Sequence, residues 1–328
     1  MIRLYHPHVY QGPLSLKHRK GYFEGWYYKF VSKKDRAFAV IPGISLKKDN
    51  SFAFIQTING DDGKTSYTTF PLSELKINYD PFCISIGENS FSLDKVLLGD
   101  RIPVSGEIHL NNVHMYKPTL FRPGIMGWYR YVPAMECYHG VVSSGHKLNG
   151  KMLYENEEFD FSDGSGYIEK DWGTSFPSSY IWMQSNSFQT TDNSFMLSVA
   201  NIPWFGSYFR GFLGFLDLGS RRITFSTYTG SILTVDSIGE HSVSITINGK
   251  GPHGRKSLKK GEVIKIEASR KAVGLLMAPH TGSMDRRIGE SIDAEISVKY
   301  SRNGEVLFQG VTRNSGLEIV GDSSELKN

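Results

Sequence analysis

The chain has 328 residues, of which 39% are hydrophobic and 21% are charged, and its formal net charge at pH 7 is +4. This length exceeds the usual size of one domain, so it predicts two cores or one very large β assembly. The composition is that of a folded globular protein and excludes extensive disorder away from the ends. Acidic and basic residues are interspersed, so no concentrated basic face is expected and nucleic-acid binding is disfavoured.

The chain shows no sign of a membrane span or of export. Its longest apolar stretches, such as residues 273–278, fall far short of the roughly 20 residues that cross a bilayer. Residues 1–8 lack the apolar core and the cleavage site of a secretory signal, so we expect a cytoplasmic protein. Cys83 and Cys137 are too few for a disulfide framework and lack metal-site spacing, and we expect them to fill apolar space.

Runs rich in β-branched and aromatic residues recur at short intervals and predict strands. These runs are 38–46, 52–58, 104–113, 180–188, 195–200, 263–268 and 292–300. Three Asn-Gly pairs, at 149–150, 248–249 and 303–304, predict tight type I′ hairpins. No segment has the pattern of a long amphipathic helix, so the predicted class is all-β, with two antiparallel barrels or sandwiches. The turn residues at 163–166 predict a domain boundary that gives domains 1–162 and 163–328.

The first unusual motif lies at residues 22–29, where five aromatic residues surround one acid and one glycine. In a strand, side chains alternate between two faces. Glu24, Trp26 and Tyr28 therefore share one face, and Phe23, Gly25 and Tyr27 share the other. Glu24 is then either a hydrogen-bonded carboxylate of the core, the commoner case on aromatic strands, or part of the lining of a site.

The second motif covers residues 166–173 and is followed by an aromatic segment at 180–188. Alternation places Tyr167, Glu169 and Asp171 on one face, with the two carboxylates about 7 Å apart. If water is excluded, each carboxylate opposes the ionisation of the other, and one of them can remain protonated as an acid catalyst. The alternative is a solvated strand end without a catalytic role.

Taken together, these blocks resemble the tocopherol cyclase family. The residues that carry the resemblance are Phe23-Glu24-Gly25-Trp26-Tyr27, Tyr167-x-Glu169-Lys170-Asp171-Trp172-Gly173, Phe176-Pro177, Trp182-x-Gln184-x-Asn186-x-Phe188, Ala278-Pro279, Asp285, Gly289 and Gly316-Leu317-Glu318. Several blocks in the correct order over most of the chain are more specific than one short motif.

The resemblance implies a pair of lipocalin-like antiparallel barrels related to the carotenoid hydratase group. It also implies a cofactor-independent cyclase, without a metal, in which an acid protonates the alkene of a prenylated benzoquinol and the phenol oxygen captures the cation to form a chroman. In that chemistry Glu169 is the expected proton donor, because the family pattern has either Asn or Asp at the position of Asp171. Asp171 would then orient Glu169 or raise its pKa.

The remaining roles in this chemistry are assigned more broadly. Trp172 or Trp182 would stabilise positive charge, and the catalytic Tyr167 or else Gln184 would be the acceptor near the phenol. The expected substrate-binding residues are Glu24, Trp26, Tyr28, His139, Trp172, Trp182, Gln184 and Asn186. For His139, a hydrogen-bonded pocket residue and a core residue are both open alternatives.

The expected partner is a hydrophobic small molecule, such as a prenyl quinol or another isoprenoid or lipid. The main alternative to an enzyme is a non-catalytic lipocalin-like carrier, and an aromatic-lined glycan-binding module is a third. A basic segment suggests either a solvated hairpin or peripheral contact with anionic lipid headgroups. Its residues are Lys250, His253, Arg255, Lys256, Lys259 and Lys260.

Overall fold

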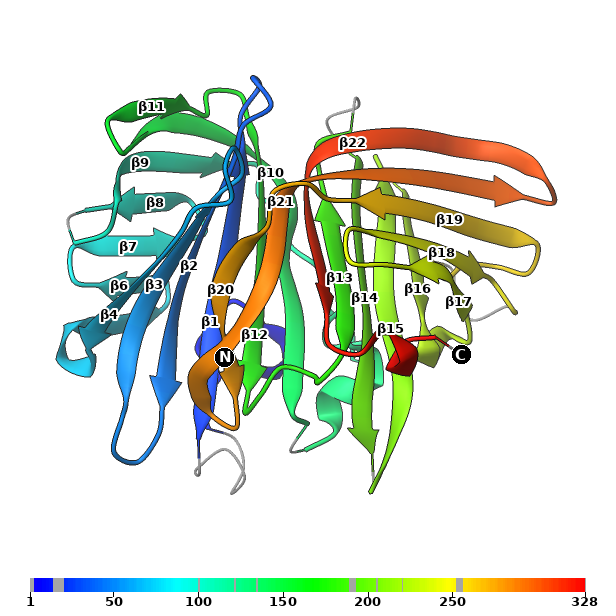
Figure 1. Cartoon of the computed structure of the whole chain (residues 1–328), viewed down its shortest axis with the longest axis horizontal. Coiled ribbons are helices and arrows are strands. Elements are labelled where there is room, and N and C mark those ends of the chain that lie inside the picture. The colour runs from blue at the N-terminus through cyan, green and yellow to red at the C-terminus, as the bar shows by residue number, and fades with distance from the viewer. Residues whose placement is uncertain are drawn as a thin grey trace. The chain divides into compact units, whose positions relative to one another are not determined.

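The computed structural model describes residues 3–13, 21–99, 101–120, 122–133, 135–188, 193–204, 206–219, 221–251 and 256–327. These residues form β-strands and short 3-10 helices, and they include no α-helix. No helix in this part of the chain is long and apolar enough to cross a membrane. The prediction of an all-β chain is confirmed, and the fold is two lipocalin-like antiparallel β units (Figure 1).

The first unit comprises residues 1–59, 63–176 and 274–288. Its strands are β1 (Tyr22–Val31), β2 (Ala37–Leu46), β3 (Phe52–Asn59), β4 (Thr65–Pro71), β5 (Leu75–Tyr79), β6 (Phe82–Ile86), β7 (Asn89–Ser92), β8 (Lys95–Leu98), β9 (Val104–Asn111), β10 (Cys137–Tyr154), β11 (Glu157–Asp160), β12 (Ser165–Gly173) and β20 (Gly274–His280). The 3-10 helices are η1 (Arg3–Tyr5), η3 (Leu72–Glu74) and η4 (Gly127–Tyr131). The main sheet has the order β4-β3-β2-β1-β12-β10-β9-β8-β7-β6-β5, and β11 pairs with β10.

The second unit comprises residues 60–62, 177–273 and 289–328. Its strands are β13 (Tyr180–Ser185), β14 (Asn193–Trp204), β15 (Ser207–Leu218), β16 (Arg221–Ser226), β17 (Ile232–Ile238), β18 (Ser242–Asn248), β19 (Glu262–Ser269), β21 (Ser283–Arg302) and β22 (Glu305–Val320), with 3-10 helices η5 (Thr227–Thr229) and η6 (Ser323–Glu325). The sheet order is β16-β15-β14-β13-β22-β21-β19-β18-β17. Strand β21 begins within the first unit, at residues 283–288, and β20 of that unit pairs with β21.

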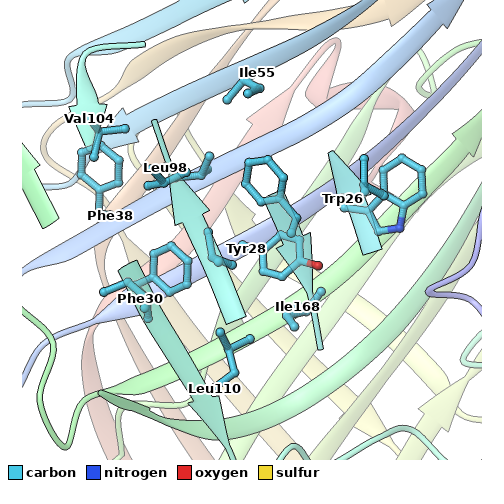
Figure 2. Packing of buried hydrophobic residues seen from close by; sticks show 14 of the residues in the cluster. Trp26, Tyr28, Phe30, Phe38, Ile55, Leu98, Val104, Leu110 and Ile168 are labelled. Atoms are coloured by element: carbon cyan, nitrogen blue, oxygen red, sulfur yellow. The ribbon is translucent and has the colours of Figure 1, made fainter. Parts of the chain in front are cut away.

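Each unit has its own hydrophobic core. In the first unit, alternate residues of β1 and β2 point into a cluster that includes Trp26, Tyr28, Phe30 and Phe38 (Figure 2). The second core includes Ile181 and Met183 of β13 together with residues of the other strands of its sheet. Burial on this scale, at about 25 cal/mol for each Å² of apolar surface, is the main source of stability in such sheets.

Several local predictions differ from the structure. The domain boundary expected after residue 162 falls at a turn that joins β11 and β12 of one sheet, whereas the first unit continues to Phe176 and regains residues 274–288. Residues 274–288 are held in the first unit by Gln56, whose side chain forms two hydrogen bonds with the backbone of Met277 (2.9 and 2.7 Å). A chain that leaves a structural unit and later returns to it leaves no compositional signal.

Only one of the three Asn-Gly pairs forms the predicted tight hairpin. Asn303 and Gly304 both have positive φ (50° and 88°) and join β21 to β22. The pair at 149–150 instead lies inside β10, where it is paired with β9. The pair at 248–249 ends β18, far before β19 begins. Strand β10 continues past the pair at 149–150 to Tyr154, and a two-residue turn at Glu155 and Asn156 joins β10 to β11. Both φ angles of this turn are positive (48° and 69°).

Candidate active site

Strand β12 lies between β1 and β10 and carries the second sequence motif. Its register places Glu169 opposite Tyr27 of β1, and Asp171 opposite His139 of β10. Since paired residues point to the same face of a sheet, Tyr167, Glu169 and Asp171 share one face, as the alternation predicted. His139 joins them from β10.

The carboxylates and the imidazole on this face form a connected cluster. The Tyr167 hydroxyl donates a hydrogen bond to Glu169 Oε2 (2.7 Å), and His139 Nδ1 lies 2.8 Å from Asp171 Oδ1. His139 Nε2 lies 3.6 Å from Glu169 Oε2. Glu169 is only 4% exposed, and the side chains of His139 and Asp171 are 13% and 23% exposed. We call Tyr167, Glu169, Asp171 and His139 the Glu169 cluster.

The charge of this cluster at neutral pH depends on His139. Burial alone would lower the pKa of this imidazole, but the Asp171 and Glu169 carboxylates and the hydrogen bond to Asp171 outweigh burial and raise the pKa to about 9. His139 is therefore an imidazolium at neutral pH. The neighbouring Cys137 remains a thiol, because burial, followed by Asp171 and other nearby carboxylates, raises its pKa.

Three residues of the cluster, His139, Glu169 and Asp171, also offer ligand atoms that lie within 4.8 Å of one another. A metal ion needs a lone pair on the imidazole, and metal binding must therefore displace the proton. With a pKa of about 9, His139 carries protons on both ring nitrogens at neutral pH. A metal ion bound by these three residues would therefore compete with the ring proton of His139.

Glu24, Trp26 and Tyr28 of the first motif lie on the opposite face of the same sheet. Glu24 is opposite Trp172 and Trp26 is opposite Lys170, so these residues point away from Glu169. The β12 backbone separates the Trp172 ring from the Glu169 carboxylate. Trp172 therefore does not stabilise charge beside Glu169, which corrects one of the two alternatives offered for that role.

Glu24 is fully buried, and several hydrogen-bond donors surround its carboxylate. It accepts hydrogen bonds from the backbone amides of Gln11 (2.8 Å) and Gly12 (3.1 Å) and from the Tyr22 hydroxyl (2.5 Å), and it forms an ion pair with Lys170. These contacts favour the core alternative for Glu24.

Lys170 completes this interior charge pair. Its ammonium donates to the carbonyl of Val9 (2.5 Å) and lies 4.6 and 5.0 Å from the ring centroids of Trp26 and Trp172. Burial lowers the pKa of Lys170 to about 8, and Glu24 opposes that shift. Trp26 and Tyr28 belong to the surrounding core, where the Trp26 indole donates to the carbonyl of His8 (2.7 Å) and Tyr28 donates to that of Ser92 (3.1 Å).

Trp182, Gln184 and Asn186 lie in the second unit. Trp182 and Gln184 are on the face of β13 opposite Ile181 and Met183, which belong to the core. Trp182 pairs with Glu318 in β22 and packs against Gly316, where a Cβ atom would lie 2.4 Å from the indole. Gln184 donates to Asn186 (3.3 Å), and both side chains are buried.

The structure adds one neighbour that was not among the expected site residues. Tyr27 is almost fully buried (8% exposed) and lies directly across from Glu169 in the β1–β12 register. Alternation alone placed Tyr27 on the face opposite Glu24, but without the register nothing linked it to Glu169. The link between His139 and Asp171 was likewise invisible, because these residues come from different strands.

Comparison with known proteins links this chain to a family. The sequence profile of the tocopherol cyclase-like family matches residues 115–321, more than half of the chain and all of the Glu169 cluster. A probable chloroplastic tocopherol cyclase from Oryza sativa subsp. japonica is 30% identical over 74 residues, which are 23% of this chain and 16% of that protein. The alignment thus spans only a small part of that relative's length.

Solved structures with the same fold cover nearly the whole chain. The crystal structure of CghA with Sch210972 aligns with a TM-score of 0.59 at 10% identity, covering 97% of this chain and 95% of CghA. Kievitone hydratase from Nectria haematococca aligns with a TM-score of 0.50 at 10% identity, covering 95% of this chain and 93% of the other. At such low identity these alignments show the shared fold alone. With the profile match over most of the sequence, the chain belongs to the tocopherol cyclase-like family.

Proposed function

We propose that this protein is a cofactor-independent cyclase of the isomerase type, which protonates the alkene of a prenylated benzoquinol and closes a chroman ring. The observation that carries the proposal is the Glu169 cluster, a set of titratable side chains that are largely shielded from solvent. Its position within the segment matched by the family profile supports the assignment. The name of the rice relative, tocopherol cyclase, supports the same type of reaction.

In this proposal the cluster holds one transferable proton at neutral pH. The His139 imidazolium lies 3.6 Å from Glu169, so a small movement brings Nε2 into hydrogen-bond range of the carboxylate. Transfer of this proton makes Glu169 a neutral acid, while Tyr167 keeps its hydrogen bond to the carboxyl group. Groups that interact this closely titrate as a unit, so the proton belongs to the His139–Glu169 pair.

The chemical step then balances within the cluster. Glu169 adds its proton to the less substituted alkene carbon, which leaves a tertiary cation on the neighbouring carbon. The phenol oxygen forms the new C–O bond to that carbon, and the phenol proton returns to the Glu169 carboxylate. In this proposal the ring of Tyr27, which lies on the same side of the sheet, stabilises the cation. Proton and charge are restored at the end of the cycle.

The decisive test is Glu169→Gln, assayed with a prenylated benzoquinol by chromatography and mass spectrometry of the chroman product. Gln retains the shape but delivers no proton, so turnover should fall at least ~100-fold. Substrate affinity, measured by tryptophan fluorescence, should stay within a few-fold. The matched control is Glu158→Gln, an exposed carboxylate paired with Lys151, which should leave turnover unchanged.

Two outcomes contradict the proposal. Full turnover in Glu169→Gln would show that another group is the acid. Tight binding of prenylated quinols by the unmodified protein, without any product, would establish the non-catalytic carrier instead.

A further inference from the structure

Strands β14 and β15 extend beyond their sheet as a two-stranded ribbon. Strand β13 pairs with β14 only as far as Ala200, and β16 pairs with β15 only from Leu213 onward. The register between β14 and β15 nevertheless continues to the pair Trp204 and Ser207. In Figure 1 this hairpin runs past the ends of the neighbouring strands of its unit.

The base of the ribbon is fixed by polar contacts. The Arg210 guanidinium donates to the carbonyls of Leu326 and Leu233 (2.9 Å each). Across the ribbon, the Asn201 amide donates to Glu325 (3.0 Å), and the Asn201 backbone N–H donates to Ser179 (3.0 Å). A two-stranded hairpin is marginally stable alone in water, and these contacts keep the ribbon projecting from the unit.

Beyond this base most of the described side chains of the ribbon are apolar, and the exposed Ser207, opposite Trp204, is polar. Ile202, Trp204 and Phe209 share one face, and the Trp204 and Phe209 rings pack edge to face with centroids 5.8 Å apart. Pro203 and Tyr208 form the other face, and Tyr208 is 64% exposed. The sequence has no Asp or Glu from residue 193 to residue 216.

We propose that this ribbon tip, formed by Ile202, Pro203, Trp204, Tyr208 and Phe209, inserts into the interface of a lipid bilayer. Trp and Tyr are the side chains enriched at the boundary between headgroups and acyl chains, where an apolar ring and a polar edge are both accommodated. A stretch free of carboxylates also avoids repulsion from anionic headgroups. The inference stands on the hairpin and does not require the reaction proposed above.

A protein partner fits this surface less well. A stable protein interface buries about 800 Å² on each side, and a narrow two-stranded tip is too small for that. Shallow insertion into a bilayer needs only a few apolar side chains. The tip also differs from the basic segment singled out in the sequence, of which His253 and Arg255 lie outside the described residues.

The test is flotation of the full chain with two kinds of vesicle, phosphatidylcholine alone and an equimolar mixture of phosphatidylcholine and phosphatidylglycerol. The double variant Trp204→Ser/Tyr208→Ser should bind both vesicles roughly tenfold or more weakly than the unmodified protein. The matched control is Trp128→Ser, which removes a 47% exposed Trp outside the hairpin and should leave binding unchanged. Tyr208→Ser alone should give a smaller loss, and because Tyr208 is 64% exposed this change should leave the fold intact.

Several results would overturn the proposal. Unmodified protein that floats with neither vesicle does not insert. Binding that survives in the double variant but is lost at high salt would assign the contact to basic residues such as Lys256, Lys259 and Lys260, because salt screens charge contacts far more than apolar burial. Loss of self-association in the double variant, with vesicle binding unchanged, would identify the occupant as a second copy of the chain.

Discussion

The interior pair of Glu24 and Lys170 should be a main determinant of the stability of the first unit. The informative change is Glu24→Gln, which keeps the volume and removes the charge. Both carboxylate oxygens accept backbone N–H groups, from Gln11 and Gly12. Whichever way the new amide turns, its NH₂ group faces one of these donors and leaves that donor without an acceptor.

The cost can be worked out from the contacts. A buried donor left without an acceptor costs about 1–3 kcal/mol, and removal of one partner from a buried ion pair costs about 3–5 kcal/mol in total. The second, larger range includes the cost of leaving the ammonium of Lys170, which is fully buried, without its carboxylate partner. Because a typical domain is stable by only about 5–15 kcal/mol, the variant should unfold at a much lower urea concentration.

Equilibrium urea unfolding, followed by circular dichroism, measures this loss. Exposed Glu158→Gln should change the free energy of unfolding by less than about 1 kcal/mol. The double variant Glu24→Gln/Lys170→Met should lose less than the sum of the two single variants, because its components remove the same interaction. A loss below about 1 kcal/mol for Glu24→Gln, or strict additivity of the two changes, would refute the reasoning.

Two further predictions concern pH. Asp171→Asn should move the alkaline limit of turnover to lower pH, because Asp171 is the carboxylate that raises the pKa of His139 most; an unchanged pH profile of turnover would contradict this coupling. Burial lowers the pKa of His146 to about 3 and that of His8 to about 4. Below pH 6.5 these two histidines therefore bind more protons in the unfolded chain than in the folded chain. The free energy of unfolding should fall as the pH is lowered. His146→Asn should reduce the slope of unfolding free energy against pH by at most about 1.4 kcal/mol per pH unit. Urea unfolding between pH 6.5 and 4 measures this slope. An unchanged slope would show that His146 is not buried as a neutral ring.

The local pattern of the sequence determined the strands and the faces of individual strands. Side chains alternate with a period of two whatever the strand pairs with, so the shared face of Tyr167, Glu169 and Asp171 followed from spacing alone. The same rule placed Glu24, Trp26 and Tyr28 together. The all-β class and the family blocks were also readable without any tertiary contact.

The tertiary structure decided which strands pair and in which register. Only the β1–β12–β10 pairing places Glu24 and Glu169 on opposite faces of one sheet and brings His139 to Asp171. Pairing also decided that the Asn-Gly pair at 149–150 lies within a strand, because its partner strand β9 is supplied from elsewhere in the chain. Registers between distant strands are fixed by the burial of whole faces, a free energy summed over the entire unit. No single segment of the sequence carries that information.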